Sequence, residues 1–268
     1  MLILLPPSEA KARARAGDPY DFNHAPTPVR PVIRRVRKVL ISLCRKDPLA
    51  AGRALKLGAR GADLIDLNAH LNTELCAPAA EVYTGVLFDS LNLADITPAA
   101  RAWADTHLAI SSALFGLVQP ADEIPAYRLS AGTSLPSLPP LPKLWQPAIQ
   151  KHLAALPAVD SELIFDLRSG PYAGLWRPRA AWSSRVVVGK VWHEGADGRV
   201  RATSHANKAV KGRLIRDLAH AGVVATDPSG LTAAMNDLGW SAQQREGHID
   251  ILESSPEDSD CEPAQFAR

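Results

Sequence analysis

The first five residues of the chain are all apolar, and Pro6 and Pro7 follow them at once. A run this short, ended by two prolines, is better suited to a strand than to a helix. A strand with no polar alternation is buried on both faces, which is typical of the parallel sheets of α/β proteins. A second segment, 162–167, is mostly apolar and is interpreted as a second buried strand. The two segments therefore predict two buried strands in a protein of the α/β (α+β) class.

Most of the remaining chain has helical spacing. Apolar residues recur every three or four positions in seven segments, which are 29–44, 47–57, 62–71, 78–91, 97–105, 143–156 and 206–220. A short helix over 228–238 follows. Two hairpins are expected, one from the segments 185–192 and 199–203 and one from 240–244 and 248–252. The globular part then spans residues 1–252, and the acidic, polar stretch 253–268 is predicted to be a disordered tail.

Composition excludes several classes of protein. The 268 residues carry a net charge of only +2, so any role with nucleic acid depends on where the charge lies. Cys44, Cys76 and Cys261 are widely separated and form no CxxC pair, which argues against a disulfide framework or a zinc ribbon. We find neither a signal peptide nor a membrane span in the sequence. A cytoplasmic protein with no membrane partner is expected.

Positive charge is concentrated in the segment 29–61. The helix over 29–44 has one face of arginine and lysine, and the helices over 47–57 and 62–71 are joined through Gly58 and Gly61. Such a helix-hairpin-helix-like element, at about 47–71 and flanked by Arg53, Lys56 and Arg60, can offer backbone N–H groups to a DNA phosphate. A plain pair of antiparallel helices with a basic surface is the alternative.

The helix over 206–220 is the second cationic segment. Lys208, Lys211, Arg213 and Arg216 are expected around its more exposed side, and its N-terminal end beside His205 could hold an anion. A solvated surface helix is the alternative interpretation.

Polar residues follow both predicted strands directly. Ser8, Glu9 and Lys11 come after the first, and Asp166 and Tyr172 lie at and after the end of the second. Because parallel strands end at the same edge of a sheet, we expect these groups to lie near one another and to face a cleft. An ordinary exit from strand to loop is the alternative.

Four motifs along the chain, taken together, carry a family resemblance. They are Leu4-Leu5-Pro6-Pro7-Ser8-Glu9-Ala10-Lys11, Val82-Tyr83-Thr84-Gly85, Phe115-Gly116-Leu117-Val118 with Pro120 and Tyr127-Arg128-Leu129, and His205-Ala206-Asn207-Lys208 with Lys211-Gly212. In these residues the chain resembles the YaaA family of peroxide-stress proteins, from its first residue to about Leu252. The resemblance implies a single compact domain of a family-specific fold, with a central mixed sheet surrounded by helices.

The resemblance also implies a function, which is binding of double-stranded DNA in a positively charged cleft and a role in limiting iron-driven oxidative damage. Its helix-hairpin-helix falls around Gly58 and Gly61, and its cleft draws on Lys11, Lys208, Lys211 and Arg216. The full set of candidate DNA- or anion-binding residues is Lys11, Arg53, Lys56, Gly58, Arg60, Gly61, Arg128, Lys208, Lys211, Arg213 and Arg216. Slight sequence preference and steep salt dependence are expected of such binding.

An enzyme is the alternative, because phosphate binding alone has little use for hydroxyl, carboxylate and imidazole groups at strand ends. The candidate catalytic residues are Ser8, Glu9, Asp166, Tyr172 and His205. Asp166 or Glu9 would act as base and His205 or Tyr172 as acid, on a nucleotide- or nucleobase-like anion held by Lys11 or Lys208. The pocket would comprise Lys11, Asp166, Tyr172, His205 and Lys208.

Cofactor and metal sites are not indicated. The sequence has no GxSxG, Walker, HExxH or Rossmann motif, so we expect no cofactor. Its histidines are not paired at metal-ligand spacing, so direct binding of iron or another metal is not predicted. We expect a monomer.

Overall fold

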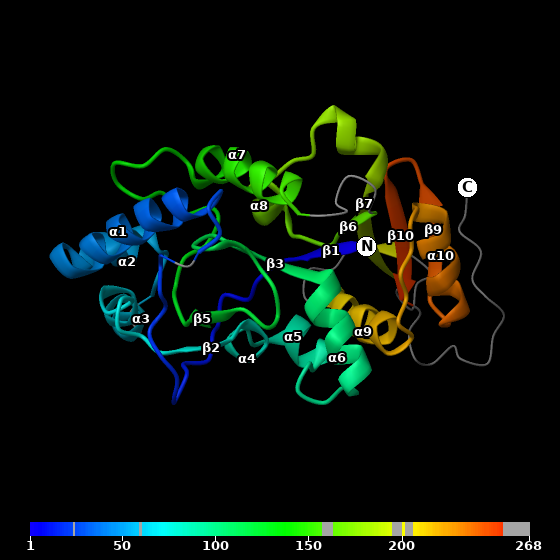
Figure 1. The fold of residues 1–268 in the computed structure, drawn as a ribbon, viewed down its shortest axis with the longest axis horizontal. Coiled ribbons are helices and arrows are strands. Elements are labelled where there is room, and N and C mark those ends of the chain that lie inside the picture. The colour runs from blue at the N-terminus through cyan, green and yellow to red at the C-terminus, as the bar shows by residue number, and fades with distance from the viewer. Residues whose placement is uncertain (24, 59–60, 157–162, 195–199, 202–205, 254–268) are drawn as a thin grey trace.

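Parallel strands form the centre of the sheet. In the computed structural model, which describes residues 1–23, 25–58, 61–156, 163–194, 200–201 and 206–253, β1 (Leu2–Leu5) lies between β3 (Leu108–Ser112) and β6 (Ile164–Asp166) and is parallel to both (Figure 1). β7 (Val186–Glu194) continues the parallel order beside β6, and β10 (His248–Glu253) lies beside β7. The two short apolar strands predicted from the sequence are thus confirmed as neighbours.

The edges of the sheet are antiparallel. β4 (Gly116–Val118) pairs with β3, β9 (Ser241–Arg245) pairs with β10, and β8 (Val200–Arg201) pairs with β7. The order across the sheet is β4-β3-β1-β6-β7-β10-β9. A separate two-stranded sheet pairs β2 (Cys76–Pro78) with β5 (Glu123–Pro125). The sheet is therefore mixed, as predicted.

Helices surround the sheet. Figure 1 shows α7 and α8 on one side of the central strands and α5, α6 and α9 on the other, with α1, α2 and α3 at one end of the molecule. The helix bounds are α1 Arg30–Lys46, α2 Pro48–Ala54, α3 Ala62–Ala69, α4 Ala79–Val82, α5 Val86–Leu91, α6 Pro98–His107, α7 Leu141–Ala154, α8 Gly170–Ala173, α9 Ala206–His220 and α10 Pro228–Asp237, with a 3-10 helix η1 at Ala180–Arg185. The α/β class and the single compact domain are confirmed.

The core lies where the sequence has its longest apolar runs. Ile3, Leu4 and Leu5 of β1 are completely buried, because helices cover both faces of the strand. Trp145 and Leu153 are also completely buried, on the face of α7 that packs toward the sheet. Within the described residues no helix is long and apolar enough to cross a membrane.

The single helix predicted over 78–91 is wrong. The structure has β2, α4 and α5 in this stretch, and the chain is extended at Tyr83 between the two helices. Gly85 has φ +94°, a conformation that side-chain-bearing residues rarely adopt, and it precedes α5 directly. Tyr83 pairs in a β-bridge with Lys11, and its hydroxyl bonds a residue far along the chain, as described below.

The two helices of the predicted helix-hairpin-helix-like element are present as α2 and α3. Asp47 caps α2, since its carboxylate accepts a hydrogen bond from Ala50 N at 2.9 Å. Arg60 and its neighbour 59, in the connection, lie outside the described residues, as do His205 and the predicted tail from 254 onward. Glu253 is the last residue of β10, so the sheet reaches one residue beyond the predicted end of the domain.

Candidate functional site

The loop after β1 is bound tightly to the extended segment around Tyr83. Lys11 forms a β-bridge with Tyr83, and Ala12 N donates to Val82 O at 2.9 Å. Thr84 N donates to Ser8 Oγ at 3.1 Å, and the same hydroxyl donates to Ala10 O at 2.6 Å. These bonds hold the backbone at Lys11 in place and so fix the position of its Cα atom.

The Lys11 amine lies among neutral groups. Its Nζ donates to Ser8 O at 2.7 Å and sits 4.3 Å from the ring centroid of Tyr127 and 5.3 Å from that of Tyr83. Burial lowers the pKa of Lys11 to about 7; the negative charge of Glu9 opposes this shift, and the positive charge of Arg128 adds to it. The Lys11 amine therefore loses its proton more readily than the amine of an exposed lysine.

Two buried tyrosines and a serine form a chain of hydroxyl groups beside Lys11. The Tyr83 and Tyr127 hydroxyls are 3.0 Å apart, and Tyr127 OH is 2.7 Å from Ser112 Oγ. Ser112 Oγ also accepts a hydrogen bond from Phe115 N at 2.9 Å. Burial raises the pKa of Tyr83 to about 12 and raises that of Tyr127 well above its usual value. Both phenols therefore stay neutral and present uncharged rings to the amine.

A charged pair and a third tyrosine complete this site. Glu9 forms an ion pair with Arg128, and Tyr172 OH donates to Glu9 Oε1 at 3.4 Å. Burial, followed by the charge of Glu9, raises the pKa of Tyr172. The name lysine–tyrosine cluster is used below for Glu9, Lys11, Tyr83, Tyr127, Arg128 and Tyr172. Asn68 of α3 fixes Arg128, since its side chain accepts from Arg128 N at 2.9 Å and donates to Arg128 O at 2.8 Å.

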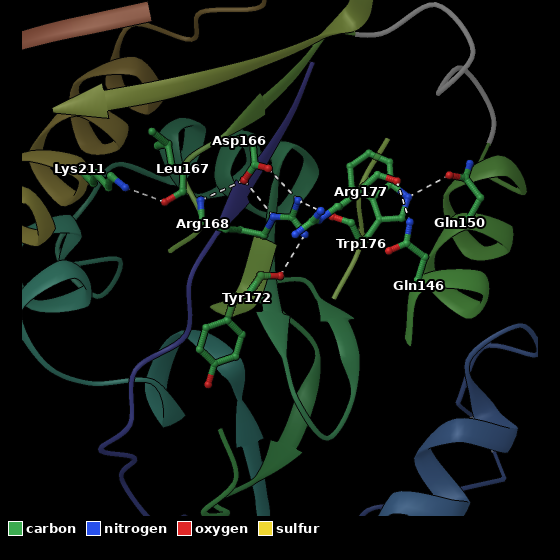
Figure 2. Close-up of polar contacts among 9 residues, drawn as sticks. All are labelled: Gln146, Gln150, Asp166, Leu167, Arg168, Tyr172, Trp176, Arg177 and Lys211. Atoms are coloured by element: carbon green, nitrogen blue, oxygen red, sulfur yellow. Dashed lines mark hydrogen bonds and ion pairs between the residues drawn. The ribbon is translucent and has the colours of Figure 1, made fainter. Parts of the chain in front are cut away.

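Asp166 belongs to a different cluster, shown in Figure 2. Its Oδ1 accepts from Arg168 Nε at 2.9 Å and its Oδ2 accepts from an Arg168 terminal nitrogen at 2.7 Å, and both side chains are buried. Arg168 also donates to Tyr172 O at 3.3 Å and to Trp176 O at 2.9 Å. The Tyr172 ring points away from this ion pair. The predicted proximity of the two strand ends is confirmed by the contact between Glu9 and Tyr172, whereas the Asp166 carboxylate faces Arg168.

The cationic residues of α9 do not share one exposed face. Lys208 and Arg213 are exposed, and Arg213 pairs with Glu253. Lys211 Nζ instead donates to Leu167 O at 2.8 Å (Figure 2), and burial lowers the pKa of Lys211 against the opposing charge of Asp166. Arg216 donates to Asp95 O at 2.6 Å and to Asn92 O at 3.1 Å. The expectation that Lys211 and Arg216 lie on the exposed side is wrong, because their long side chains reach main-chain carbonyls.

The solvent face of α1 forms a basic hollow. The helix contains no aspartate or glutamate, and a depression of about 430 Å³ is lined by Arg34, Arg37, Lys38, Ile41, Ser42, Arg45, Lys46 and Asn72. The Arg37 guanidinium stacks on Phe22 at 3.8 Å, and among the described residues its buried Nε has no hydrogen-bond partner. Burial, together with the neighbouring charge of Arg34, lowers the pKa of Arg37. Arg37 as a whole is half-buried, and its neighbours Arg34, Lys38 and Arg45 are exposed, so the hollow presents positive charge to an anion.

A groove beside this hollow involves α2 and α3. It encloses about 800 Å³, and Arg45, Arg53, Gly58 and Gly61 are among its lining residues. Lys56 is exposed nearby and has φ +53°. Gly61 precedes α3 without a side-chain cap, so the first N–H groups of that helix have no side-chain acceptor there. Among the residues that the structure describes, no three His, Cys, Asp or Glu side chains gather as a metal site.

Sequence reasoning missed three residues that shape these sites. Asn68 and Ser112 are buried polar residues that act on partners distant in sequence, Arg128 and Tyr127. The sequence indicated Arg37 only as one of several charged residues on a helix face, and gave no sign that it stacks on Phe22. Gly85 was the available signal for the break after Tyr83, because glycine inside an apparent helix often marks its end.

Comparison with known proteins identifies the same family over most of the chain. A family model described as "Peroxide stress protein YaaA" matches residues 1–246. A UPF0246 protein of Streptomyces coelicolor is 38% identical over 246 residues, which cover 91% of this chain and 92% of the relative. UPF0246 proteins of Corynebacterium efficiens and Corynebacterium glutamicum are 37% and 33% identical, and each match covers 94% of this chain and 98% of the relative.

Proposed function

Because this chain belongs to the YaaA family of peroxide stress proteins, we propose that it binds double-stranded DNA in the cytoplasm during oxidative stress and limits iron-mediated damage to it. The observation that carries the proposal is the basic hollow on α1, which adjoins the groove of α2 and α3. The three helices that line them, α1, α2 and α3, lie at the same end of the molecule (Figure 1). They offer a continuous surface for a phosphate backbone.

Phosphate contacts from this surface would hold a duplex without reading its bases. Lysine and arginine side chains neutralise phosphates and release counterions, and N–H groups at the start of a helix add favourable dipoles. The side chains of Arg35, Lys38 and Lys46 recur along one face of α1 and are exposed. Binding with little sequence preference follows from such contacts.

The α1–α3 surface is better supported than a cleft lined by the late helix. Arg128 and Arg213 are paired with Glu9 and Glu253, and Lys211 and Arg216 donate to main-chain carbonyls. These groups already have protein acceptors. Arg34 and Arg45 of α1 also donate to Asn23 Oδ1 and Ala69 O, but α1 carries no acid, and its Arg35, Lys38 and Lys46 are exposed to solvent. Lys208 is exposed and could add a peripheral phosphate contact.

Removing three charges from α1 is expected to weaken DNA binding. The combined variant carries Arg35→Gln, Lys38→Gln and Lys46→Gln. In it, the slope of log affinity against log salt concentration should become less negative by up to about 2.7, because each lost phosphate contact changes that slope by about 0.9. Affinity at about 0.1 M salt should fall at least about tenfold. Fluorescence anisotropy of a labelled duplex, titrated between about 50 and 200 mM salt, measures both quantities.

The matched control removes the same charge elsewhere. Lys143, Lys151 and Lys190 are exposed on α7 and β7, and their combined change to glutamine should leave the salt slope unchanged. Equal weakening in both triple variants would show that net charge, not the α1 surface, governs binding. Absence of binding by the unmodified protein at low salt would reject the proposal itself.

We infer a second candidate function, an enzyme acting on a small anionic substrate such as a nucleotide, from the lysine–tyrosine cluster. Glu9 is the better placed of the two candidate bases, since its side chain is 48% exposed, whereas the Asp166 carboxylate is buried and both of its oxygens are bound by Arg168. Tyr172 would act as the acid, and Lys11 and Arg128 would provide positive charge for the substrate. The half-buried amine among neutral rings is the observation that favours this function.

A thermal-shift titration tests this second function. AMP in excess of its dissociation constant should raise the melting temperature by about 3 °C, because ligand binding to the folded state alone stabilises it. The shift should disappear in Lys11→Met and persist in Lys38→Met, which changes an exposed lysine of α1. A shift that both variants retain would place the nucleotide elsewhere.

A further inference from the structure

The cavity between α1, α7 and β4 has no role in either function considered above. Its volume is about 330 Å³, and α7 packs against both α1 and β4 beside it. Its most buried lining residues are apolar and include Ile33 of α1, Leu153 of α7 and Phe115, each no more than 2% exposed. Leu156, at the rim, is 39% exposed. A cavity of this size is at the lower end of the range for small-molecule sites, so it suits a ligand of one or two rings.

Aromatic rings form one wall of the cavity. Tyr20 and Phe115 both line it, and their ring centroids are 5.0 Å apart with an interplanar angle of 51°. Phe22 packs against both rings, at 4.6 Å from Tyr20 and 6.4 Å from Phe115. Tilted and offset rings of this kind accept a further ring at an edge or a face. The wall therefore favours an aromatic ligand over a purely aliphatic one.

Three polar side chains converge on the cavity without bonding one another. Tyr20, Asp122 and His152 line it, and among the described residues none of the three is hydrogen-bonded or ion-paired to another. Asp122 Oδ2 accepts a hydrogen bond from Gln119 N at 2.8 Å, which leaves Oδ1 available. Burial raises the pKa of Asp122, lowers the pKa of His152 and raises the pKa of Tyr20 to about 12. Perturbed groups gathered in one cavity are typical of a ligand site.

The charge around the cavity is negative. Asp122 and Glu123 are its acids, and no described lysine or arginine lines it. Within the described part of the chain the Glu123 carboxylate makes no hydrogen bond or ion pair, so it has no counter-ion. His152 is neutral at pH 7, because burial lowers its pKa from an ordinary value of 6.5. The cavity thus favours a cation, in contrast to the basic hollow on α1, and is unsuited to a nucleotide or a DNA phosphate.

We propose that this cavity binds a small aromatic amine, with its ring against Tyr20 and Phe115 and its ammonium group between Asp122 and His152. An ammonium group has three N–H donors. Asp122 Oδ1 accepts one of them, a ring nitrogen of neutral His152 accepts the second, and water at the rim accepts the third. The apolar lining removes the aromatic ring from water, which favours binding in proportion to the area buried.

A matched series of three ligands tests the sign of the charge. 2-Phenylethylamine, 2-phenylethanol and phenylacetate differ mainly in the head group, which is cationic, neutral and anionic in turn at about pH 8. The amine should bind the full chain with a dissociation constant of about 1 mM or below. Its affinity should exceed that of the alcohol about tenfold, because a hydrogen bond between charged groups replaces a neutral one. Phenylacetate should bind more weakly than the alcohol. Isothermal titration calorimetry measures all three affinities.

The position of the bound amine is measured with isoleucine methyl groups. Ile33 and Ile124 line the cavity, whereas Ile249 and Ile251 lie in β10, far across the sheet from β4. In NMR spectra of protein labelled at these methyl groups, the first pair of resonances should shift as the amine is added, and the second pair should not. Shifts confined to β10 would place the amine elsewhere and contradict the proposal.

Asp122→Asn separates recognition of the charge from filling of the cavity. Asparagine retains a carbonyl oxygen that can accept the hydrogen bond from Gln119 N, so the turn should keep its shape. The variant should lose the preference for the amine over the alcohol, while its affinity for the alcohol stays unchanged. Asp237→Asn is the matched control, because it removes an exposed carboxylate of α10 and should retain the preference.

Three further outcomes overturn the proposal. The first is no binding of the amine at about 10 mM, and the second is phenylacetate binding as tightly as the amine. The third is the same preference for the amine in Asp122→Asn as in Asp237→Asn, since the carboxylate in the cavity would then not be what recognises the ammonium group. Unchanged methyl resonances of Ile249 and Ile251 in each variant show that the rest of the sheet is intact.

Discussion

Replacing Arg168 by methionine is expected to lower the free energy of unfolding by about 3–5 kcal/mol, because the change leaves a buried carboxylate without its counter-ion. The side chain of Arg168 is only 1% exposed and that of Asp166 only 8%. Methionine fills similar volume but donates no hydrogen bond. Tyr172 O and Trp176 O would lose a donor at the same time.

A half-buried pair of the same chemistry, in contact with solvent, provides the control. Arg101 binds both oxygens of Asp105 at 3.0 Å on α6, where the two side chains are 32% and 29% exposed. Arg101→Met should cost less than about 1 kcal/mol, because water screens and solvates both charges. Urea denaturation measures both variants. Equal losses would show that burial does not amplify the Asp166–Arg168 interaction.

A double variant refines the prediction. Combining Arg168→Met with Asp166→Leu removes the orphaned charge and should recover part of the lost stability. Recovery should be incomplete, because the two carbonyls still lack the arginine donor. Through its bond to Tyr172 O, Arg168 also positions the tyrosine whose hydroxyl reaches Glu9. The ion pair therefore supports the lysine–tyrosine cluster without touching Lys11.

Gly212→Ala is expected to lower the free energy of unfolding by about 3 kcal/mol, since α9 crosses α5 at this glycine. A Cβ atom there would lie 2.3 Å from Leu87 O, 2.7 Å from Ser90 Cβ and 2.9 Å from Leu91 N. Two of these contacts are with backbone atoms, which cannot rotate away, so the helices must separate. The loss far exceeds the gain of about 1 kcal/mol that alanine brings to a helix interior.

Gly52 of α2 is the matched control for the Gly212 variant. A Cβ at Gly52 would meet only Ile65 Cδ1, at 3.7 Å, which is an ordinary contact. Gly52→Ala should therefore raise stability by about 0.5–1 kcal/mol. Thermal and urea unfolding of both variants test the pair. A Gly212→Ala protein as stable as the unmodified one would mean that the α5–α9 crossing adapts at little cost.

The local parts of the fold could be predicted from the sequence. The run 1–5 specifies β1 because its residues have no polar alternation and prolines end it, and α1 follows from its apolar spacing. Thr97 and Asp47 cap helices as their residue types suggest. These features depend on residues within a few positions of each other.

The site could be predicted only in part. The closeness of the β1 and β6 ends follows from parallel pairing, which brought Glu9 and Tyr172 together. Tyr83 is held by contacts with Lys11 and Tyr127, and Arg128 is held by Asn68, 60 residues away, so no local pattern in the sequence indicates either position. Helical spacing placed Lys211 and Arg216 on α9 correctly. It could not indicate that their side chains donate hydrogen bonds to main-chain carbonyls of other segments.

The pairing of β1 has a consequence for synthesis of the protein. Along the sequence this strand precedes both of its partners, which are Leu108–Ile110 on one side and Ile164–Asp166 on the other. Until the ribosome has produced both, Ile3, Leu4 and Leu5 have no sheet to enter, and long-range parallel pairing is slow to form. During synthesis the apolar residues of β1 therefore remain prone to aggregation until Asp166 has been made.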